Sequence, residues 1–106
     1  IHTPNVLNKT REHFNCNSIK GAPLENNGDR ATTGSHWEEY HLNDEYMIGI
    51  MYSGLQKVSS ITLALFDDTG WYNVDYNYAH NYQWGKDEGC EFWDINCVDK
   101  NSGISR

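Results

Sequence analysis

The feature that most constrains the fold is an apolar segment in the second half of the chain, residues 55–68. Apolar side chains recur along it at the spacing of one helix face: Leu55, Val58, Ile61, Thr62 and Leu65. Its other faces are apolar too, which is typical of a buried helix. Ser53 can cap the start, and Gly70 stands where a helix-ending glycine is expected. The sequence therefore predicts a buried helix whose last residues, Asp67 and Asp68, need partners at its negative end.

The rest of the chain offers only short elements. Pro4 predicts an extended lead-in over residues 1–7, because the residue before a proline disfavours helix. A short helix is expected over residues 9–14, ending near Asn15. Glycine, proline and asparagine predict loop over residues 17–33. The remaining predictions are an extended piece over residues 22–25, a strand or packed extended segment over 71–78 and a turn over 84–90.

Composition narrows the class of protein. Hydrophobic residues make up 38% and aromatic residues 13% of the 106 positions, which is too much apolar surface for a disordered tail. The 15 acidic and 8 basic residues give a formal charge of −7, which repels phosphate backbones and argues against a nucleic-acid partner. No apolar run approaches the ~20 residues of a membrane span. Any secretion signal or lipid anchor would lie outside this segment.

Cysteine usage leaves two interpretations open. The chain has three cysteines, Cys16, Cys90 and Cys97. In a secreted protein an odd count indicates a free thiol or a partner elsewhere. In a cytosolic protein the three would be buried and reduced. A sequon for N-glycosylation at Asn8-Lys9-Thr10 adds a little to the secreted interpretation.

The five histidines do not by themselves form a metal site. A catalytic zinc needs three protein ligands, and the compact His-Glu-x-x-His signature is absent from this chain. His36 and His41 are five residues apart, about 140° around a helix, and make a poor pair there. The chain also has no Gly-x-Ser-x-Gly elbow and no phosphate-binding glycine loop. The pairing of Cys16 with His13 is better explained by a helix end than by a thiol nucleophile.

The order of several short motifs, however, resembles the leishmanolysin-type peptidases. The resemblance extends from about residue 8 to residue 97, nearly the whole chain. Each motif is weak alone, but together they stand in register. They are Arg11-Glu12-His13-Phe14-Asn15-Cys16, Gly34-Ser35-His36-Trp37-Glu38, Asp44-Glu45-Tyr46-Met47, the helix from Ser60 to Tyr72, Trp84-Gly85-Lys86, Gly89-Cys90 and Cys97.

This family is a branch of the metzincins, and the resemblance implies a metal site. Its members bind one zinc through three histidines, of which the first two lie in a His-Glu-x-x-His helix. By resemblance His36 is the third ligand, and Met47 of the Met-turn lies beneath the metal as an apolar floor. The two other ligands and the glutamate that acts as general base would lie upstream of Ile1. Ile48 and Gly49 would form the wall of the substrate pocket, or else only the loop that leads into the next helix.

The resemblance also implies a fold, a disulfide and a location. The fold is expected to be α+β, mainly helix and loop, as the disulfide-stapled C-terminal subdomain of a metzincin zinc peptidase. Residues 1–106 would form part of that peptidase domain. Cys16 would pair with Cys90, and Cys97 with a cysteine beyond Arg106. These pairs imply an oxidising compartment, hence an extracellular or cell-surface protein.

The expected function is that of a zinc endopeptidase segment. Joined to the upstream half, it would hydrolyse peptide bonds with a zinc-activated water. The segment alone should be inactive. One alternative is a non-catalytic relative that serves as a structural or binding component of a cell-surface or extracellular assembly, and another is an independent secreted binding domain. Tyr40, where the family often has arginine, and Ile48-Gly49 after the methionine depart from the family pattern and leave substrate preference open.

Overall fold

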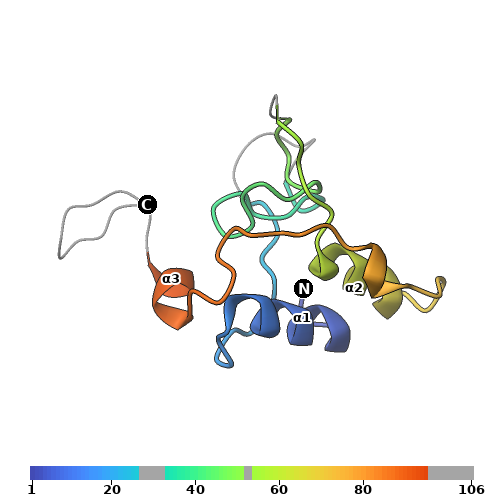
Figure 1. Cartoon of the computed structure of the whole chain (residues 1–106), viewed down its shortest axis with the longest axis horizontal. Helices are drawn as coiled ribbons and strands as arrows, with labels where there is room; N and C mark the ends of the chain where they lie inside the picture. The colour runs from blue at the N-terminus through green and yellow to red at the C-terminus, as the bar shows by residue number, and fades with distance from the viewer. Residues whose placement is uncertain (27–32, 52–53, 96–106) are drawn as a thin grey trace.

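The computed structural model describes residues 1–26, 33–51 and 54–95. Four helical segments follow one another in these residues: α1 (Pro4–Phe14), α2 (Ser60–Asp68), the 3-10 helix η1 (Tyr76–Tyr78) and α3 (Cys90–Asp94). Helices α1 and α2 pack against each other, and in Figure 1 the green segments of the chain between them lie above both helices. Strand structure in the described residues is limited to three isolated bridges. The predicted architecture of mainly helix and loop with little strand is thus confirmed.

Helix α1 is longer than predicted. It begins at Pro4 instead of residue 9, so the expected extended lead-in ends at Thr3, the N-cap residue. Proline is favoured in the first helical turn, where its missing N–H needs no partner. The predicted end is confirmed, because Asn15 adopts a left-handed conformation with φ of 54°.

The N-terminus of α1 is capped by a residue from the far end of α2. The Asp68 carboxylate accepts hydrogen bonds from the backbone N–H groups of Asn5 (3.0 Å) and Val6 (2.9 Å) and from the Asn5 amide (2.8 Å). Burial alone would raise the pKa of Asp68, but hydrogen bonds from Thr3, Val6 and Asn5 bring it below its ordinary value. Asp68, one of the two aspartates at the end of α2, thus has the partner that the sequence analysis predicted it would need.

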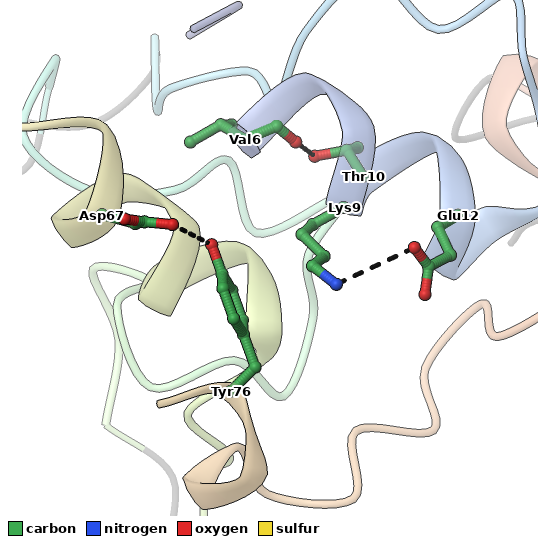
Figure 2. A network of polar contacts seen from close by, with 6 residues as sticks. All are labelled: Val6, Lys9, Thr10, Glu12, Asp67 and Tyr76. Atoms are coloured by element: carbon green, nitrogen blue, oxygen red, sulfur yellow. Dashed lines mark hydrogen bonds and ion pairs between the residues drawn. The ribbon is translucent and has the colours of Figure 1, made fainter. Parts of the chain in front are cut away.

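The other terminal aspartate, Asp67, faces η1. Figure 2 shows the Tyr76 hydroxyl donating to the Asp67 carboxylate at 2.8 Å. Partial burial raises the pKa of the Tyr76 phenol to about 12, and the neighbouring Asp67 carboxylate adds to the effect. The C-terminal end of α2 is therefore joined both to α1 and to η1.

Helix α2 begins five residues later than predicted. Its N-cap is Ser59, whose hydroxyl accepts from the Ile61 N–H at 3.2 Å, whereas the predicted cap, Ser53, lies outside the described residues. The preceding residues are extended because Lys57 pairs with the backbone around Glu45. The predicted end is confirmed, with Gly70 in the left-handed region after the helix.

The prediction that this segment is buried on all sides is only partly right. Ile61, Thr62 and Ala64 are buried, but Phe66 is exposed, and Leu55, outside the helix, is 75% exposed. The expected strand or packed segment over residues 71–78 is wrong. Residues 71–75 are irregular and lead into η1. Trp71 is 83% exposed there, since no second strand lies beside it in the described chain.

The disulfide between Cys16 and Cys90 is confirmed, with the two Cα atoms 4.9 Å apart. The neighbouring backbones support it, because the Gly89 N–H donates to the Phe14 carbonyl at 2.8 Å. A Cβ atom at Gly85 would stand 2.3 Å from Phe14 Cε1, so only glycine allows this close approach. The predicted turn over residues 84–90 is present up to Asp87. The pairing of Cys97 lies outside the described residues.

The core gathers side chains from the helices and from the loops above them. Its buried members are Val6, Phe14, Cys16, Ile19, Ala22, Trp37, Leu42, Ile48, Ile61, Ala64 and Tyr82. The expected extended piece over residues 22–25 is reduced to one bridge between Leu24 and Trp37. Within the described residues, every helix is too short or too polar to span a lipid bilayer.

Candidate functional site

The predicted metal ligand and the predicted Met-turn lie side by side. The Trp37 N–H donates to the Met47 carbonyl at 3.0 Å, and Trp37 forms a parallel bridge with Ile48. His36 immediately precedes Trp37, so its backbone is held next to the Met-turn. Two motifs that are 11 residues apart in the sequence are thereby brought to one place in the fold.

His36 itself is half-buried at the end of a tight loop. Its carbonyl accepts from the Glu25 N–H at 2.8 Å, and the Gly34 N–H donates to the Glu25 carbonyl at 2.8 Å. The Ser35 hydroxyl lies 3.1 Å from Nδ1 of the imidazole. Histidines that bind a metal through one ring nitrogen usually have the other held by a hydrogen bond. With Nδ1–H as the donor and the Ser35 hydroxyl as the acceptor, this contact is of the kind that supports a metal-binding histidine.

The Met-turn is held on its second side by the segment that leads into α2. The Tyr46 N–H donates to the Lys57 carbonyl at 2.6 Å, and the Lys57 N–H donates to the Asp44 carbonyl at 2.9 Å. Asp44 adopts a left-handed conformation with φ of 69°, which bends the chain into the turn. Met47 is partly buried and packs against the core. The turn is thus clamped between residues 37 and 57.

Sequence reasoning missed one residue of this site, Glu45. Its side chain is fully buried and accepts hydrogen bonds from the Met47 N–H (2.9 Å), the Ser59 N–H (2.9 Å), the Ser59 hydroxyl (2.5 Å) and the Thr62 hydroxyl (2.7 Å). Thr62 in turn accepts from the Trp37 indole N–H at 2.9 Å. The one available signal was the pair Ser59 and Thr62, two hydroxyls three residues apart at the start of a helix.

The residues proposed as the wall of a substrate pocket occupy two environments. The Ile48 side chain is 5% exposed and packs in the core, whereas Gly49 is half-exposed. Further along, Met51 is 93% exposed. Ile48 has a packing role in this structure, and its assignment as pocket wall stays a prediction.

The other histidines have roles away from His36. His13 donates from Nε2 to the Trp84 carbonyl at 2.8 Å. The His41 ring packs on Trp93 with centroids 4.6 Å apart, and Nδ1 of His80 accepts from the Val58 N–H at 3.0 Å. Within the described ranges no three His, Cys, Asp or Glu side chains gather as a metal site. A centre built on His36 therefore needs ligands from outside these residues.

The sequon lies on α1. Asn8 is exposed, but Thr10 is fully buried and its hydroxyl donates to the Val6 carbonyl at 2.7 Å (Figure 2). In the folded helix the hydroxyl is therefore engaged within the chain. Glycosylation of Asn8 stays a prediction, and glycan transfer would have to precede folding.

Comparison with known proteins identifies the class. The leishmanolysin family model matches residues 1–104. The chain is 42% identical to a leishmanolysin homolog of Crithidia fasciculata, over 95% of this chain and 15% of that protein. It is 43% identical to a leishmanolysin-like peptidase of Drosophila melanogaster, over 92% of this chain and 14% of that protein. It is 36% identical to the ciliated left-right organizer metallopeptidase of Danio rerio, over 98% of this chain and 17% of that protein.

These matches, together with a fold that joins a His-Trp segment to a methionine turn, define part of a metallopeptidase domain. The chain belongs to the leishmanolysin family. It spans only 14 to 17% of the length of these relatives. The activity, substrates and partners of a whole protein are therefore a matter for proposal.

Proposed function

We propose that this chain is the C-terminal half of a zinc endopeptidase domain and supplies the third zinc ligand, His36. The observation that carries this proposal is the hydrogen bond from the Trp37 N–H to the Met47 carbonyl, 3.0 Å long, which sets the ligand segment against the Met-turn. One zinc ion would be held, with two further histidines from the upstream half of the same domain. A protein or peptide is the substrate.

The residues of this chain have defined roles in that reaction. When bound, the zinc lowers the pKa of a water molecule and polarises the scissile carbonyl. His36 holds the metal through Nε2, Met47 forms an apolar floor, and Gly49 lines the side-chain pocket. The general base comes from the upstream half. Glu45 does not serve as that base, because it is buried and both of its oxygens already accept hydrogen bonds.

The same proposal places the protein outside the cytosol. The Cys16–Cys90 disulfide supports an oxidising compartment, either extracellular or at the cell surface. The exposed Asn8 then carries a glycan, and the peptidase can work within a larger cell-surface assembly. Nucleic acid is not among the partners, since the chain has a net charge of −7.

The test is zinc content of the full-length protein after His36→Ala, with His2→Ala as the control. His2 is exposed, so its loss removes an imidazole without disturbing the fold. We expect His36→Ala to lose bound zinc in elemental analysis and to lose cleavage of a quenched fluorescent peptide. We expect His2→Ala to retain both.

The same measurement separates the proposal from its alternative. A wild-type protein that is folded by circular dichroism but binds no zinc would be a non-catalytic relative with a structural or binding role. A His36→Ala protein that keeps one tightly bound zinc would rule His36 out as a ligand.

A further inference from the structure

Glu45 is a fully buried carboxylate at the centre of the region that joins the Met-turn to α2. One oxygen, Oε1, accepts from the Met47 N–H at 2.9 Å. The other, Oε2, accepts from the Ser59 N–H at 2.9 Å, the Ser59 hydroxyl at 2.5 Å and the Thr62 hydroxyl at 2.7 Å. A buried charge needs such partners, because its transfer from water is otherwise very unfavourable.

The direction of each hydrogen bond follows from the chemistry of the groups. An indole N–H can only donate, so Thr62 accepts from Trp37 and its single hydroxyl proton goes to Glu45. The Ser59 hydroxyl accepts from the Ile61 N–H, so its proton also goes to Glu45. Every group that faces the carboxylate is a donor. An acceptor with two oxygens is therefore required at this position.

Trp37 is connected to Glu45 by two routes, one through Met47 and one through Thr62. Its backbone N–H donates to the Met47 carbonyl, and its indole N–H donates to Thr62. Met47 and Thr62 both donate to Glu45, one to each oxygen. The segment that carries His36 is thus fixed to the Met-turn directly and, a second time, through Glu45.

We propose that Glu45 is a positioning residue of the metal centre, which sets the place of His36 relative to the Met-turn through Met47, Thr62 and Trp37. This inference rests on the proposed function, in which His36 is a zinc ligand. Glu45 touches neither metal nor substrate. Its effect is to hold two segments in register, and hydrogen-bonded groups that orient a metal ligand typically change metal affinity by about 10- to 100-fold.

The first variant to make is Glu45→Gln in the full-length protein, with Glu88→Gln as the control. An amide keeps one acceptor oxygen, but its NH₂ group must then face an N–H or O–H donor in place of the other oxygen. Glu88 is exposed, so the same chemical change there leaves the hydrogen bonds of Glu45 intact. We expect the dissociation constant for zinc to rise by about tenfold or more in Glu45→Gln and to stay at the wild-type value in Glu88→Gln.

A second pair of variants separates positioning from folding. Thr62→Val keeps the shape of the side chain but lacks the hydroxyl that joins Trp37 to Glu45, and Thr62→Ser keeps the hydroxyl. Zinc affinity and the visible absorption spectrum of the cobalt-substituted protein should change in Thr62→Val and return towards wild type in Thr62→Ser. A merely structural role would lower the free energy of unfolding of Thr62→Val, but the folded variant would keep the zinc affinity and the cobalt spectrum of the wild-type protein.

The outcomes distinguish this inference from the proposed function. If His36→Ala loses zinc while Glu45→Gln and Thr62→Val keep wild-type affinity and spectrum, the positioning role is wrong and the ligand assignment stands. If His36→Ala keeps its zinc, the ligand assignment fails and this inference fails with it. If Glu45→Gln does not fold, the comparison of Thr62→Val with Thr62→Ser decides.

Discussion

At the scale of single residues, the ionisation of the His13 side chain is linked to its place in the fold. Burial lowers the pKa of His13 and outweighs the Trp84 carbonyl, which would raise it. Among the nearby charges, Lys86 also lowers the pKa and Asp87 opposes this. The ring stacks on Tyr82 with centroids 4.9 Å apart. The folded chain therefore favours the neutral imidazole.

This leads to a prediction about pH. The folded pKa lies below the unfolded value of about 6.5, so the unfolded chain binds more protons in the interval between them. The stability that neutral His13 contributes is present above about pH 6.5 and is lost as the pH falls towards the folded pKa. In His13→Gln, whose amide can still donate to the Trp84 carbonyl, the melting temperature should fall less between about pH 8 and pH 5.

The matched control is His2→Gln, in which an exposed imidazole is replaced. It should show the same pH dependence of the melting temperature as the wild-type protein. Equal pH dependence in His13→Gln and wild type would contradict a lowered pKa for His13 in the fold.

Single residues also show what sequence could and could not predict at the site. The order of motifs pointed to the Cys16–Cys90 disulfide, and the structure confirms it. Gly70 was recognisable because a left-handed position after a helix favours glycine. Glu45 was not recognisable, because its partners Ser59 and Thr62 lie 14 and 17 residues away, and their own spacing does not indicate which carboxylate they bind. A buried carboxylate looks like any surface glutamate in a single sequence.

At the scale of elements, both main helices were predicted with a correct end and a wrong start. The ends depend on local residues, Asn15 and Gly70, whose conformations a short stretch of sequence reveals. The starts depend on distant partners. Asp68 caps α1 from 62 and 63 residues away, and the pairing of Lys57 with the Met-turn keeps residues before Ser59 extended. Neither contact can be predicted from helix propensity or from the periodicity of apolar residues, because both are properties of the local sequence.

The Asp68 cap gives a prediction at this scale. Helix α1 has no acidic residue in its first turn and no side-chain cap from Thr3, so Asp68 is its main source of negative charge there. Asp68→Ala should lower the free energy of unfolding by about 1 kcal/mol, the usual cost of removing a helix cap. Chemical denaturation monitored by circular dichroism measures it.

The control is Asp94→Ala, which removes an exposed aspartate from the end of α3. The loss of unfolding free energy caused by Asp68→Ala should become smaller as the pH falls through the lowered pKa of Asp68. A protonated carboxyl group has no negative charge to interact with the N-terminus of α1. A cost that equals that of Asp94→Ala at neutral pH would show that α1 does not depend on this cap.

At the scale of the whole molecule, the disulfide joins parts of the chain separated by 74 residues. A cross-link over a loop of that length should stabilise the fold by about 4 kcal/mol through the reduced entropy of the unfolded chain. The double variant Cys16→Ala/Cys90→Ala should therefore melt well below the wild-type protein in calorimetry without reductant. Equal melting temperatures would mean that the bridge contributes little beyond the contacts of Phe14 with Gly85 and Gly89.

The class of fold was predictable at this scale, but the packing was not. The family resemblance carried by the order of short motifs was enough to predict helix and loop joined by a disulfide, which the structure shows. The prediction that residues 71–78 form a strand or a packed segment was wrong, because Trp71 and Tyr78 are exposed. Aromatic residues favour burial when a surface is available, and a sequence does not state which surfaces a fold provides.

The contacts that stabilise α1 come from residues far along the sequence, and this has a consequence for biosynthesis. An isolated helix of 11 residues is marginal in water, and α1 gains its cap from Asp68 and its anchor from Cys90 only after those residues have been made. Translation at about 5–20 residues per second places Asp68 roughly 3–12 s behind Asn8. If Asn8 carries a glycan, as proposed, the sugar would have to be transferred before α1 is fixed in the fold, because the folded helix buries the Thr10 hydroxyl of the sequon.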